Sequence, residues 1–327
     1  MRILTFAQAL NEALCEEMSR DERVFLMGED VALSAISPVT AGLAERFGTE
    51  RVRNTPISEL GFTGAGVGAA MAGYRPVLDM RRVDFMILAC DQIVNQAAKL
   101  RYMLGGQVSV PLVIRAPAGG GVQSGPTHSQ CIEGWFLQVP GLKIAVPSDP
   151  ADAKGLLKTA IRDDNPILFV EYRSLYNLKG AVPDGDVTVP FGQAVVKREG
   201  EDVSLIGIGS QVAICLEAAE TLAKEGISAE VVDPRTISPL DVKGLAGSVR
   251  KTGRCVIAEE GHRQGGVGAE IAASIQAEVF GAVKAPIERV AALDVPIPVQ
   301  RKLEAYVLPN AEKIVEAARR ALAFSSS

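Results

Sequence analysis

Few side chains of this sequence can exchange a proton near neutral pH. The chain has two histidines, His128 and His262, and imidazole is the side chain whose ordinary pKa lies closest to 7. His128 follows a glycine-rich stretch, residues 118–125, which is typical of a surface loop that carries a functional group. The plainer interpretation of an isolated histidine is a surface residue near a helix start. We expect His262 to lie in a turn or an interface.

A carboxylate, Glu59, stands at the opening turn of an apolar helix expected over residues 61–73. The helix dipole favours a negative charge there, so the simplest explanation of Glu59 is structural. The catalytic alternative is a buried carboxyl group that forms a hydrogen bond with a bound ring. Position alone does not decide between these roles.

The same helix fits a competing hypothesis, an NAD-binding dehydrogenase. Gly64, Gly66 and Ala69 match the GxGxxG/A dinucleotide fingerprint, and Asp79 ends a following strand. The fingerprint needs a strand directly before the glycines, and the residues before Gly64 do not form one. Close packing of the helix on a neighbouring backbone explains the small residues better.

The elements that must position these residues alternate between helix and strand. Continuous apolar strands separated by helices indicate a mostly parallel sheet covered on both faces, so we predict a doubly wound α/β domain over residues 1–178. Its helices are expected over residues 5–18, 40–47, 61–73, 84–103 and 151–161. Its strands are expected over residues 24–27, 77–80, 112–115, 144–146 and 167–170.

A second α/β domain is predicted over residues 191–327, after a linker at residues 179–190. The linker has clustered Lys, Gly, Pro and Asp residues without a helical period. Strands are then expected over residues 203–208, 229–232 and 255–258. Helices are expected over residues 211–225, 240–249, 266–279 and 311–322.

Composition limits the partners and the compartment. The net charge is -5 over 327 residues, and both signs are mixed throughout, so no basic face indicates nucleic acid or an anionic membrane. Five scattered cysteines argue against a disulfide framework or a zinc site. No apolar run has the length of a spanning helix or a signal-peptide core, so we expect a cytoplasmic protein.

Several ordered motifs resemble one enzyme family almost from end to end. They are Thr55-Pro-Ile-Ser-Glu59, Asp91-Gln-Ile-Val-Asn-Gln-Ala-Ala-Lys99, Arg101-Tyr-Met-Leu-Gly-Gly106, Thr127-His-Ser-Gln130, Pro234-Arg-Thr-Ile-Ser-Pro-Leu-Asp241, Gly265-Gly-Val-Gly-Ala-Glu270 and Asp294-Val-Pro-Ile-Pro298. The family is that of the beta subunits of thiamine-diphosphate-dependent 2-oxo acid and acetoin dehydrogenases. The resemblance implies a transketolase-like pyrimidine-binding domain followed by a transketolase C-terminal-like domain.

The resemblance also implies roles for individual residues. Glu59 is expected to form a hydrogen bond with N1′ of the cofactor's aminopyrimidine ring, with Ile57 beside it and Phe85 stacked on the ring. Without the resemblance, Phe85 would be interpreted as a core aromatic. His128 is expected at the mouth of the active site, as proton donor when an acyl group passes to a lipoyl dithiolane.

Metal sites are implied in the same way. Oxygen ligands suit a hard cation, and a structural potassium ion in some family members is held at positions that match Leu112, Ala160, Ile161, Asp163 and Asn165. The stretch is equally consistent with a helix C-terminal turn. Mg²⁺ and the diphosphate are usually held by a GDG motif together with a later Asn. This combination is missing here, because no Asn lies between Asn177 and Asn310. The resemblance implies that an alpha subunit supplies them.

The implied function is that of the first component of a 2-oxo acid dehydrogenase complex. An α2β2 heterotetramer would cleave pyruvate or acetoin and acylate a lipoyl group on a core acyltransferase. A branched-chain 2-oxo acid substrate and a non-catalytic scaffold subunit are the alternatives. Arg81 and Arg82 depart from the uncharged or aromatic residues that are common at these positions. They suit a substrate carboxylate, the diphosphate or acidic residues of the alpha chain.

Overall fold

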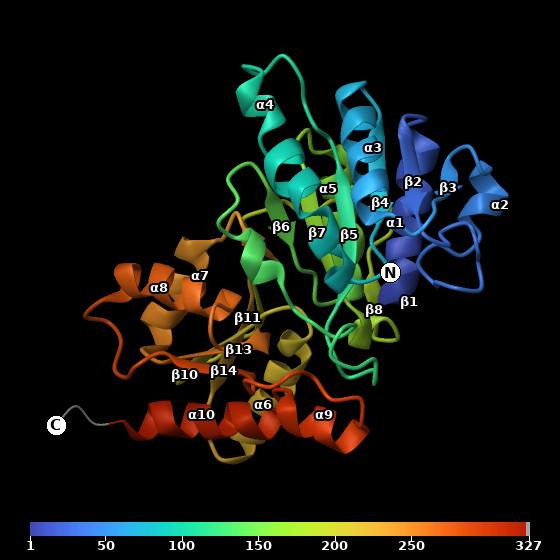
Figure 1. Ribbon diagram of the computed structural model, residues 1–327. Helices are drawn as coiled ribbons and strands as arrows, with labels where there is room; N and C mark the ends of the chain where they lie inside the picture. Colours follow the sequence, from blue (N-terminus) through green and yellow to red (C-terminus); the bar gives the residue numbers. More distant parts are fainter. Residues whose placement is uncertain (325–327) are drawn as a thin grey trace. The chain divides into compact units, whose positions relative to one another are not determined.

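The computed structural model describes residues 1–324 and divides into two compact units (Figure 1). The first comprises residues 1–118 and 136–191. The second comprises residues 119–135 and the chain from Gly192 onward. The segment 119–135, which carries His128, therefore belongs to the second unit, although the sequence places it within the expected first domain.

A parallel sheet forms the centre of the first unit. Its strands within this unit follow the order β6-β7-β5-β4-β2-β3, and each pairs with its neighbours in parallel. Their apolar residues are buried along whole strands, as expected for a sheet covered on both faces. The strands are β2 (Val24–Gly28), β3 (Val52–Asn54), β4 (Arg75–Asp79), β5 (Val113–Ala118), β6 (Lys143–Ala145) and β7 (Ile167–Tyr172).

Helices of the first unit pack around this sheet. The helix α1 begins with a capping box in which Thr5 and Gln8 exchange side-chain and backbone hydrogen bonds, and α5 has Asp149 as its N-cap. The helices are α1 (Phe6–Arg20), α2 (Leu43–Phe47), α3 (Glu59–Met71), α4 (Leu100–Met103), α5 (Pro150–Arg162) and the 3₁₀ turn η4 (Arg173–Leu175).

Two expected segments of the first unit differ from the structure. The helix expected over residues 84–103 is broken into a 3₁₀ segment η1 (Val83–Ala89), a π segment η2 (Gln92–Ala97) and α4. An apolar period does not reveal such changes in backbone hydrogen bonding. The expected linker begins with a strand, β8 (Lys179–Val182). It pairs with β1 (Arg2–Thr5), which lies at the start of the sequence. Composition could not reveal so distant a partner.

The dinucleotide-binding hypothesis is wrong. Gly64 and Gly66 lie inside α3, which already begins at Glu59, rather than in a turn between a strand and a helix. A Cβ atom on Gly66 would lie 2.9 Å from Cδ1 of Leu78 on β4. These small residues therefore let the helix approach the sheet closely.

The second unit contains a sheet with strand order β14-β13-β10-β11-β9, in which β9 alone is antiparallel to its neighbour. The strands of this sheet are β9 (Val195–Arg198), β10 (Val203–Gly207), β11 (Ala229–Asp233), β13 (Cys255–His262) and β14 (Glu288–Ala292), and the second unit also contains the short strand β12 (Thr236–Ser238). Its helices are α6 (Gln211–Lys224), α7 (Val242–Thr252), α8 (Val267–Val279), α9 (Arg301–Val307) and α10 (Ala311–Ala323). The 3₁₀ turn η3 spans Glu133–Phe136. No helix within residues 1–324 is long and apolar enough to cross a membrane.

Candidate functional site

The strand order of the first unit reverses between β2 and β4, since the chain passes from β2 to β3 on one side and returns to β4 on the other. Ligands of open α/β sheets bind outside the carboxyl ends of the strands at such a point. Gly28 ends β2 and lies in register with Asp79 at the end of β4 and Asn54 at the end of β3. A Cβ atom on Gly28 would lie 2.5 Å from the Asp79 carbonyl oxygen. Glycine is therefore needed for this close approach.

A pair of glutamates lies at this edge of the sheet. Glu59 is the first residue of α3 and is 5% exposed. Glu29 follows β2 directly, and its pKa is raised by burial, by the negative charge of Glu59 and by a hydrogen bond between the two carboxyl groups. The raised pKa favours the protonated form of Glu29. Glu29 was not predicted from the sequence, although its place directly after an apolar strand was a usable signal.

Two polar atoms at this edge are available to a polar ligand. Oε1 of Glu29 and Oγ1 of Thr55 are buried and have no hydrogen-bond partner among the described residues. Leaving such an atom unpaired costs about 1–3 kcal/mol. Ile57 adds an apolar side chain that is 82% exposed. These groups fit an aminopyrimidine ring, which has ring nitrogens that accept and an amino group that donates hydrogen bonds.

The backbone is strained on both sides of the reversal point. Asp30 after β2 and Arg81 after β4 adopt left-handed conformations with φ of 54° and 56°. Such conformations cost about 1–3 kcal/mol for residues other than glycine and cluster at functional sites. Phe85 is half-buried in η1, which packs against α3. The structure thus brings the elements of Glu59, Ile57 and Phe85 together, and stacking of Phe85 on a ring stays a prediction.

His128 lies in the second unit, in an exposed loop rather than at a helix start. Its Nδ1 is 2.9 Å from Oγ1 of Thr127. Two buried carboxylates that the sequence did not single out hold the preceding glycines. Glu260 accepts a hydrogen bond from the backbone N–H of Gly120, and Glu304 accepts one from Gly121 at 2.9 Å.

The two loop-holding carboxylates differ in their surroundings. The pKa of Glu260 is raised by burial and also by the charge of Glu304. Glu260 accepts a further hydrogen bond from the Ser210 hydroxyl. Glu304 is 1% exposed and also accepts hydrogen bonds from the backbone and side-chain N–H groups of Gln123. The loop that carries His128 is therefore fixed at its start by charge-assisted hydrogen bonds.

The residues predicted for potassium gather at the end of α5 and the start of β5. The carbonyl oxygens of Ile161 and Asp163 each accept a hydrogen bond from Nη1 of Arg75 at 3.0 Å. Lys143 forms an ion pair with the Asp163 carboxylate, and the Asn165 side chain accepts from Arg101 at 2.7 Å.

Among the remaining predicted ligands, the Leu112 carbonyl accepts from the Ile167 N–H at 2.8 Å, and the Ala160 carbonyl accepts from Asp163 at 3.3 Å. A second lone pair remains on each carbonyl, but the cationic groups of Arg75 and Lys143 oppose a cation at this turn. Potassium binding stays a prediction. Within residues 1–324, no group of three or more His, Cys, Asp or Glu side chains could hold a metal ion.

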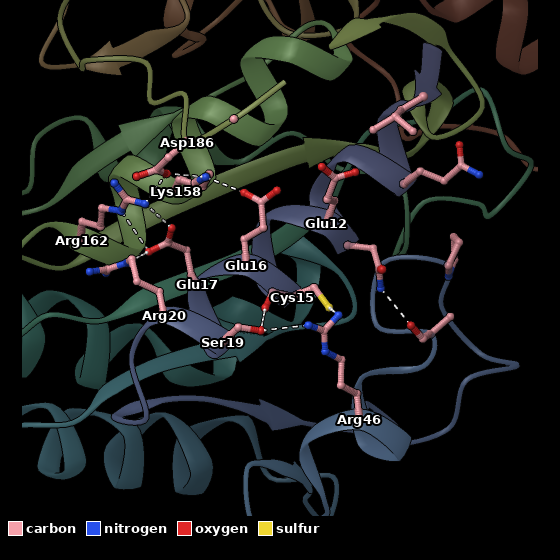
Figure 2. Close-up of a pocket in the computed structure, with 16 residues that line it drawn as sticks. Glu12, Cys15, Glu16, Glu17, Ser19, Arg20, Arg46, Lys158, Arg162 and Asp186 are labelled. Atoms are coloured by element: carbon pink, nitrogen blue, oxygen red, sulfur yellow. Dashed lines mark hydrogen bonds and ion pairs between the residues drawn. The ribbon is translucent and has the colours of Figure 1, made fainter. Parts of the chain in front are cut away.

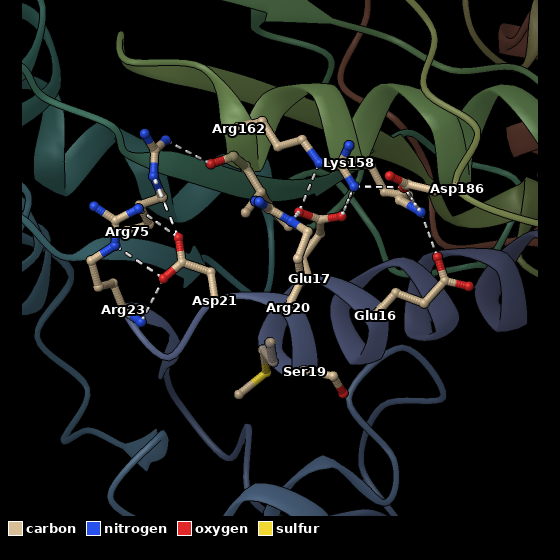
Figure 3. Close-up of polar contacts among 12 residues, drawn as sticks. Glu16, Glu17, Ser19, Arg20, Asp21, Arg23, Arg75, Lys158, Arg162 and Asp186 are labelled. Carbon is tan, nitrogen blue, oxygen red and sulfur yellow. Dashed lines mark hydrogen bonds and ion pairs between the residues drawn. The ribbon is translucent and has the colours of Figure 1, made fainter.

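A cavity of about 970 Å³ in the first unit runs along α1 and contains none of the predicted site residues (Figure 2). Its charged residues are largely paired. Buried Glu17 pairs with Arg20 and Arg162, and Lys158 pairs with Glu16 and Asp186 (Figure 3). This cavity is therefore bordered by an ion-pair network that joins α1 to α5.

Comparison with known proteins agrees with the geometry. Residues 3–179 match the pyrimidine binding domain of transketolase, and residues 192–314 match the transketolase C-terminal domain. A mitochondrial pyruvate dehydrogenase E1 component subunit beta from Dictyostelium discoideum is 47% identical over 97% of this chain and 90% of its own length. The chain belongs to the transketolase-like dehydrogenase beta subunits.

Other beta subunits of this family are almost equally similar. The 2-oxoisovalerate dehydrogenase subunit beta of Bacillus subtilis is 46% identical over 99% of both chains. The beta subunit of an acetoin:2,6-dichlorophenolindophenol oxidoreductase from Cupriavidus necator is 44% identical over 98% of both. A solved split-gene transketolase, described as an inactive beta4 tetramer, shares a TM-score of 0.79 at 27% identity over 98% of each chain. Such similar identities do not select one substrate.

Proposed function

We propose that this beta subunit supplies the aminopyrimidine half of a thiamine diphosphate site and acts with an alpha subunit on a 2-oxo acid or acetoin. The observation that carries the proposal is the Glu29–Glu59 pair, buried Glu59 beside half-buried Glu29, at the carboxyl edge of the sheet, where the strand order reverses. The family's beta subunits of pyruvate, 2-oxoisovalerate and acetoin enzymes support it.

The residues of this chain would act as follows. Glu59 forms a hydrogen bond with ring nitrogen N1′ and holds a proton there, and Glu29 shares that proton. Ile57 and Phe85 provide an apolar wall and a stacking surface for the ring. Bound thiamine diphosphate supplies a nucleophilic carbon and an electron sink for cleavage next to the substrate carbonyl.

The remaining cofactor groups are assigned to other chains. Mg²⁺ and the diphosphate are held by the alpha subunit, because this chain lacks the GDG motif and the later Asn. Two alpha and two beta chains form the heterotetramer. Potassium, if it binds at the predicted turn after α5, has a structural role. The inactive beta4 tetramer of a split-gene transketolase supports the need for a second type of chain.

His128 is assigned to the transfer step. In an exposed loop it reaches a lipoyl group on the core acyltransferase and donates a proton as the acyl group passes to the dithiolane. A positioned acid or base of this type contributes about 10²–10⁴-fold to a rate.

Co-expression with an alpha-type subunit of the same family tests the proposal. Reduction of an artificial electron acceptor is measured with pyruvate, acetoin and branched-chain 2-oxo acids, with and without thiamine diphosphate and Mg²⁺. The expected result is cofactor-dependent activity with at least one substrate, lost in Glu59→Gln. A stable complex without activity, in which Glu59→Gln changes nothing, would support a scaffold subunit instead.

A further inference from the structure

Three charged side chains lie inside the sheet of the first unit, on the adjacent strands β4, β5 and β7 (Figure 1). Arg115 of β5 and Glu171 of β7 are wholly buried, and Asp79 at the end of β4 is 3% exposed. Arg115 donates two hydrogen bonds to the Glu171 carboxylate, at 2.6 and 2.8 Å, and one to Oδ2 of Asp79, at 2.9 Å. One guanidinium group thus joins two carboxylates across three strands.

Stability alone does not explain this buried cluster. The cost of removing charges from water offsets most of their mutual attraction, and apolar groups of similar size are often no less stabilising. Burial lowers the pKa of Arg115, but the charges of Glu171 and Asp79 outweigh burial and raise this pKa above its ordinary value. Arg115 therefore stays charged, and its rigid guanidinium group holds the Asp79 carboxylate in one orientation.

Asp79 passes this constraint to the turn that follows β4. Its second oxygen, Oδ1, accepts a hydrogen bond from the backbone N–H of Arg81 at 2.9 Å. Arg81 has a left-handed backbone with φ of 56°, and an aspartate that bonds to the backbone two residues later stabilises such a turn. The backbone N–H of Arg82 then donates to the Met80 carbonyl, which completes the turn.

Two groups of the candidate site depend on this turn. The segment η1 begins directly after it and carries Phe85, whose backbone N–H donates to the Arg82 carbonyl at 3.2 Å. On the other side lies the glutamate pair. Burial and the negative charge of Glu59 raise the pKa of Glu29, and the positive charge of Arg81 opposes this rise.

We infer that Arg115 is a positioning residue of the cofactor site, which acts through Asp79 on the turn after β4. The turn places Phe85 for the pyrimidine ring and sets the charge of Arg81 that acts on Glu29. Arg115 is wholly buried in the sheet, so it acts through these neighbours and not by contact with the ring. This inference rests on the proposed function.

Asp79→Asn and Arg115→Lys, each in the alpha–beta complex, test the inference. The amide has one oxygen in place of two, so it loses the bond to Arg115 or the bond to Arg81. The ammonium group of lysine keeps the charge but cannot span both carboxylates. In both variants the affinity of the complex for thiamine diphosphate, measured by calorimetry with Mg²⁺, should fall about 2–10-fold through lost ring stacking. The kcat should fall about 10²-fold through misplacement of the ring.

The matched control is Glu17→Gln. Glu17 is equally buried and accepts two hydrogen bonds from Arg162, but it lies near the end of α1 that leads into the start of β2, at the opposite edge of the sheet. Its loss should lower the Tm, as Asp79→Asn does, and leave the cofactor affinity unchanged. Equal losses of affinity in Glu17→Gln and Asp79→Asn would indicate general destabilisation and overturn the positioning role.

The pH dependence of cofactor affinity gives a readout that a merely structural role would not move. Glu29 faces Glu59 from α3, Arg81 from the turn and Asp30 from its own segment. A protonated pair donates to the ring nitrogen, so affinity falls as pH rises through the pKa of the pair. Asp79→Asn should move the midpoint of this fall upward, as Arg81→Gln does, because the pair loses the opposing positive charge.

The sign of this shift separates the two explanations. Removal of the negative charge of Asp79 would by itself lower the pKa of a nearby carboxyl group, so a downward shift of the midpoint would overturn the inference. Unchanged affinity and an unchanged midpoint in Asp79→Asn would overturn it as well, while leaving the proposed function intact. A wild-type complex that binds no thiamine diphosphate would instead remove the proposed function itself, and the positioning role with it.

Discussion

The glutamate edge of the first unit and the His128 loop of the second unit are constructed in different ways. At the glutamate edge, Glu29 and Arg81 follow strands that pair directly in the sheet. The start of the His128 loop is held by Glu260 and Glu304, which are 140 and 183 residues away from the glycines they bind. The first site is set by strand order, whereas the second depends on distant buried charges.

The largest expected effect concerns the glutamate edge. Glu59→Gln keeps the size of the side chain but removes its ability to exchange a proton with a ring nitrogen, so thiamine-dependent turnover of the complex should fall by about 10²–10⁴-fold. Thermal unfolding should change little, because the amide keeps the size of the side chain and can still form a hydrogen bond with Glu29. An equal loss of activity in the exposed control Glu201→Gln would contradict a specific role.

His128→Asn should separate the two sites. Acylation of a lipoyl domain is expected to fall by about 10²-fold, while reduction of an artificial acceptor, which needs no lipoyl transfer, stays nearly unchanged. Both reactions are measured on the same preparation. Equal losses in both would place His128 in the cleavage step rather than in transfer.

Glu304→Gln should weaken the loop without touching the glutamate edge. The amide has one carbonyl oxygen in place of the two carboxylate oxygens that accept from the loop, so the free energy of unfolding should fall by about 1.5–3 kcal/mol. Lipoyl acylation should fall several-fold, with the artificial-acceptor rate preserved. Urea unfolding of Glu304→Gln beside Glu201→Gln checks the stability change, and identical midpoints would count against the loop-holding role.

The raised pKa of Glu260 gives a pH dependence of known sign. A carboxyl group whose pKa is raised by folding stabilises the protein most below its unfolded value, about 4.3 for glutamate, and this contribution is lost as pH rises through the folded pKa. Glu260→Gln removes the titration. Its stability relative to wild type should therefore improve between pH 4.5 and 7.5, as followed by urea unfolding. A difference that does not vary with pH would refute this.

The smallest effect tests the potassium prediction. At a K⁺ concentration of about ten times Kd, binding adds about 1.4 kcal/mol, which corresponds to a rise in Tm of a few degrees. Scans in KCl and NaCl at equal ionic strength measure it. The absence of a K⁺-specific shift would leave Arg75 and Lys143 as the cations of this turn.

The difference between the two sites also explains what the sequence could predict. Alternating apolar strands and helices predict the doubly wound sheets, and Glu59 at a helix start is visible in the sequence. Glu29 stands directly after an apolar strand, which was a usable signal, but its pairing with Glu59 required knowledge of the strand order. Glu260 and Glu304 could not be found, because a buried carboxylate that holds a distant loop has no local pattern. The strand β8 and the breaks in the 84–103 helix were not predicted for the same reason, because tertiary contacts rather than local sequence patterns determine them.

The most direct test of the central claim is a structure of the assembled alpha–beta complex with bound thiamine diphosphate and Mg²⁺. The account predicts that a carboxyl oxygen of Glu59 lies within hydrogen-bond distance, about 2.6–3.2 Å, of the pyrimidine N1′, and that Glu29 contacts Glu59. A pyrimidine ring held away from Glu59, or wholly by the alpha subunit, would contradict it.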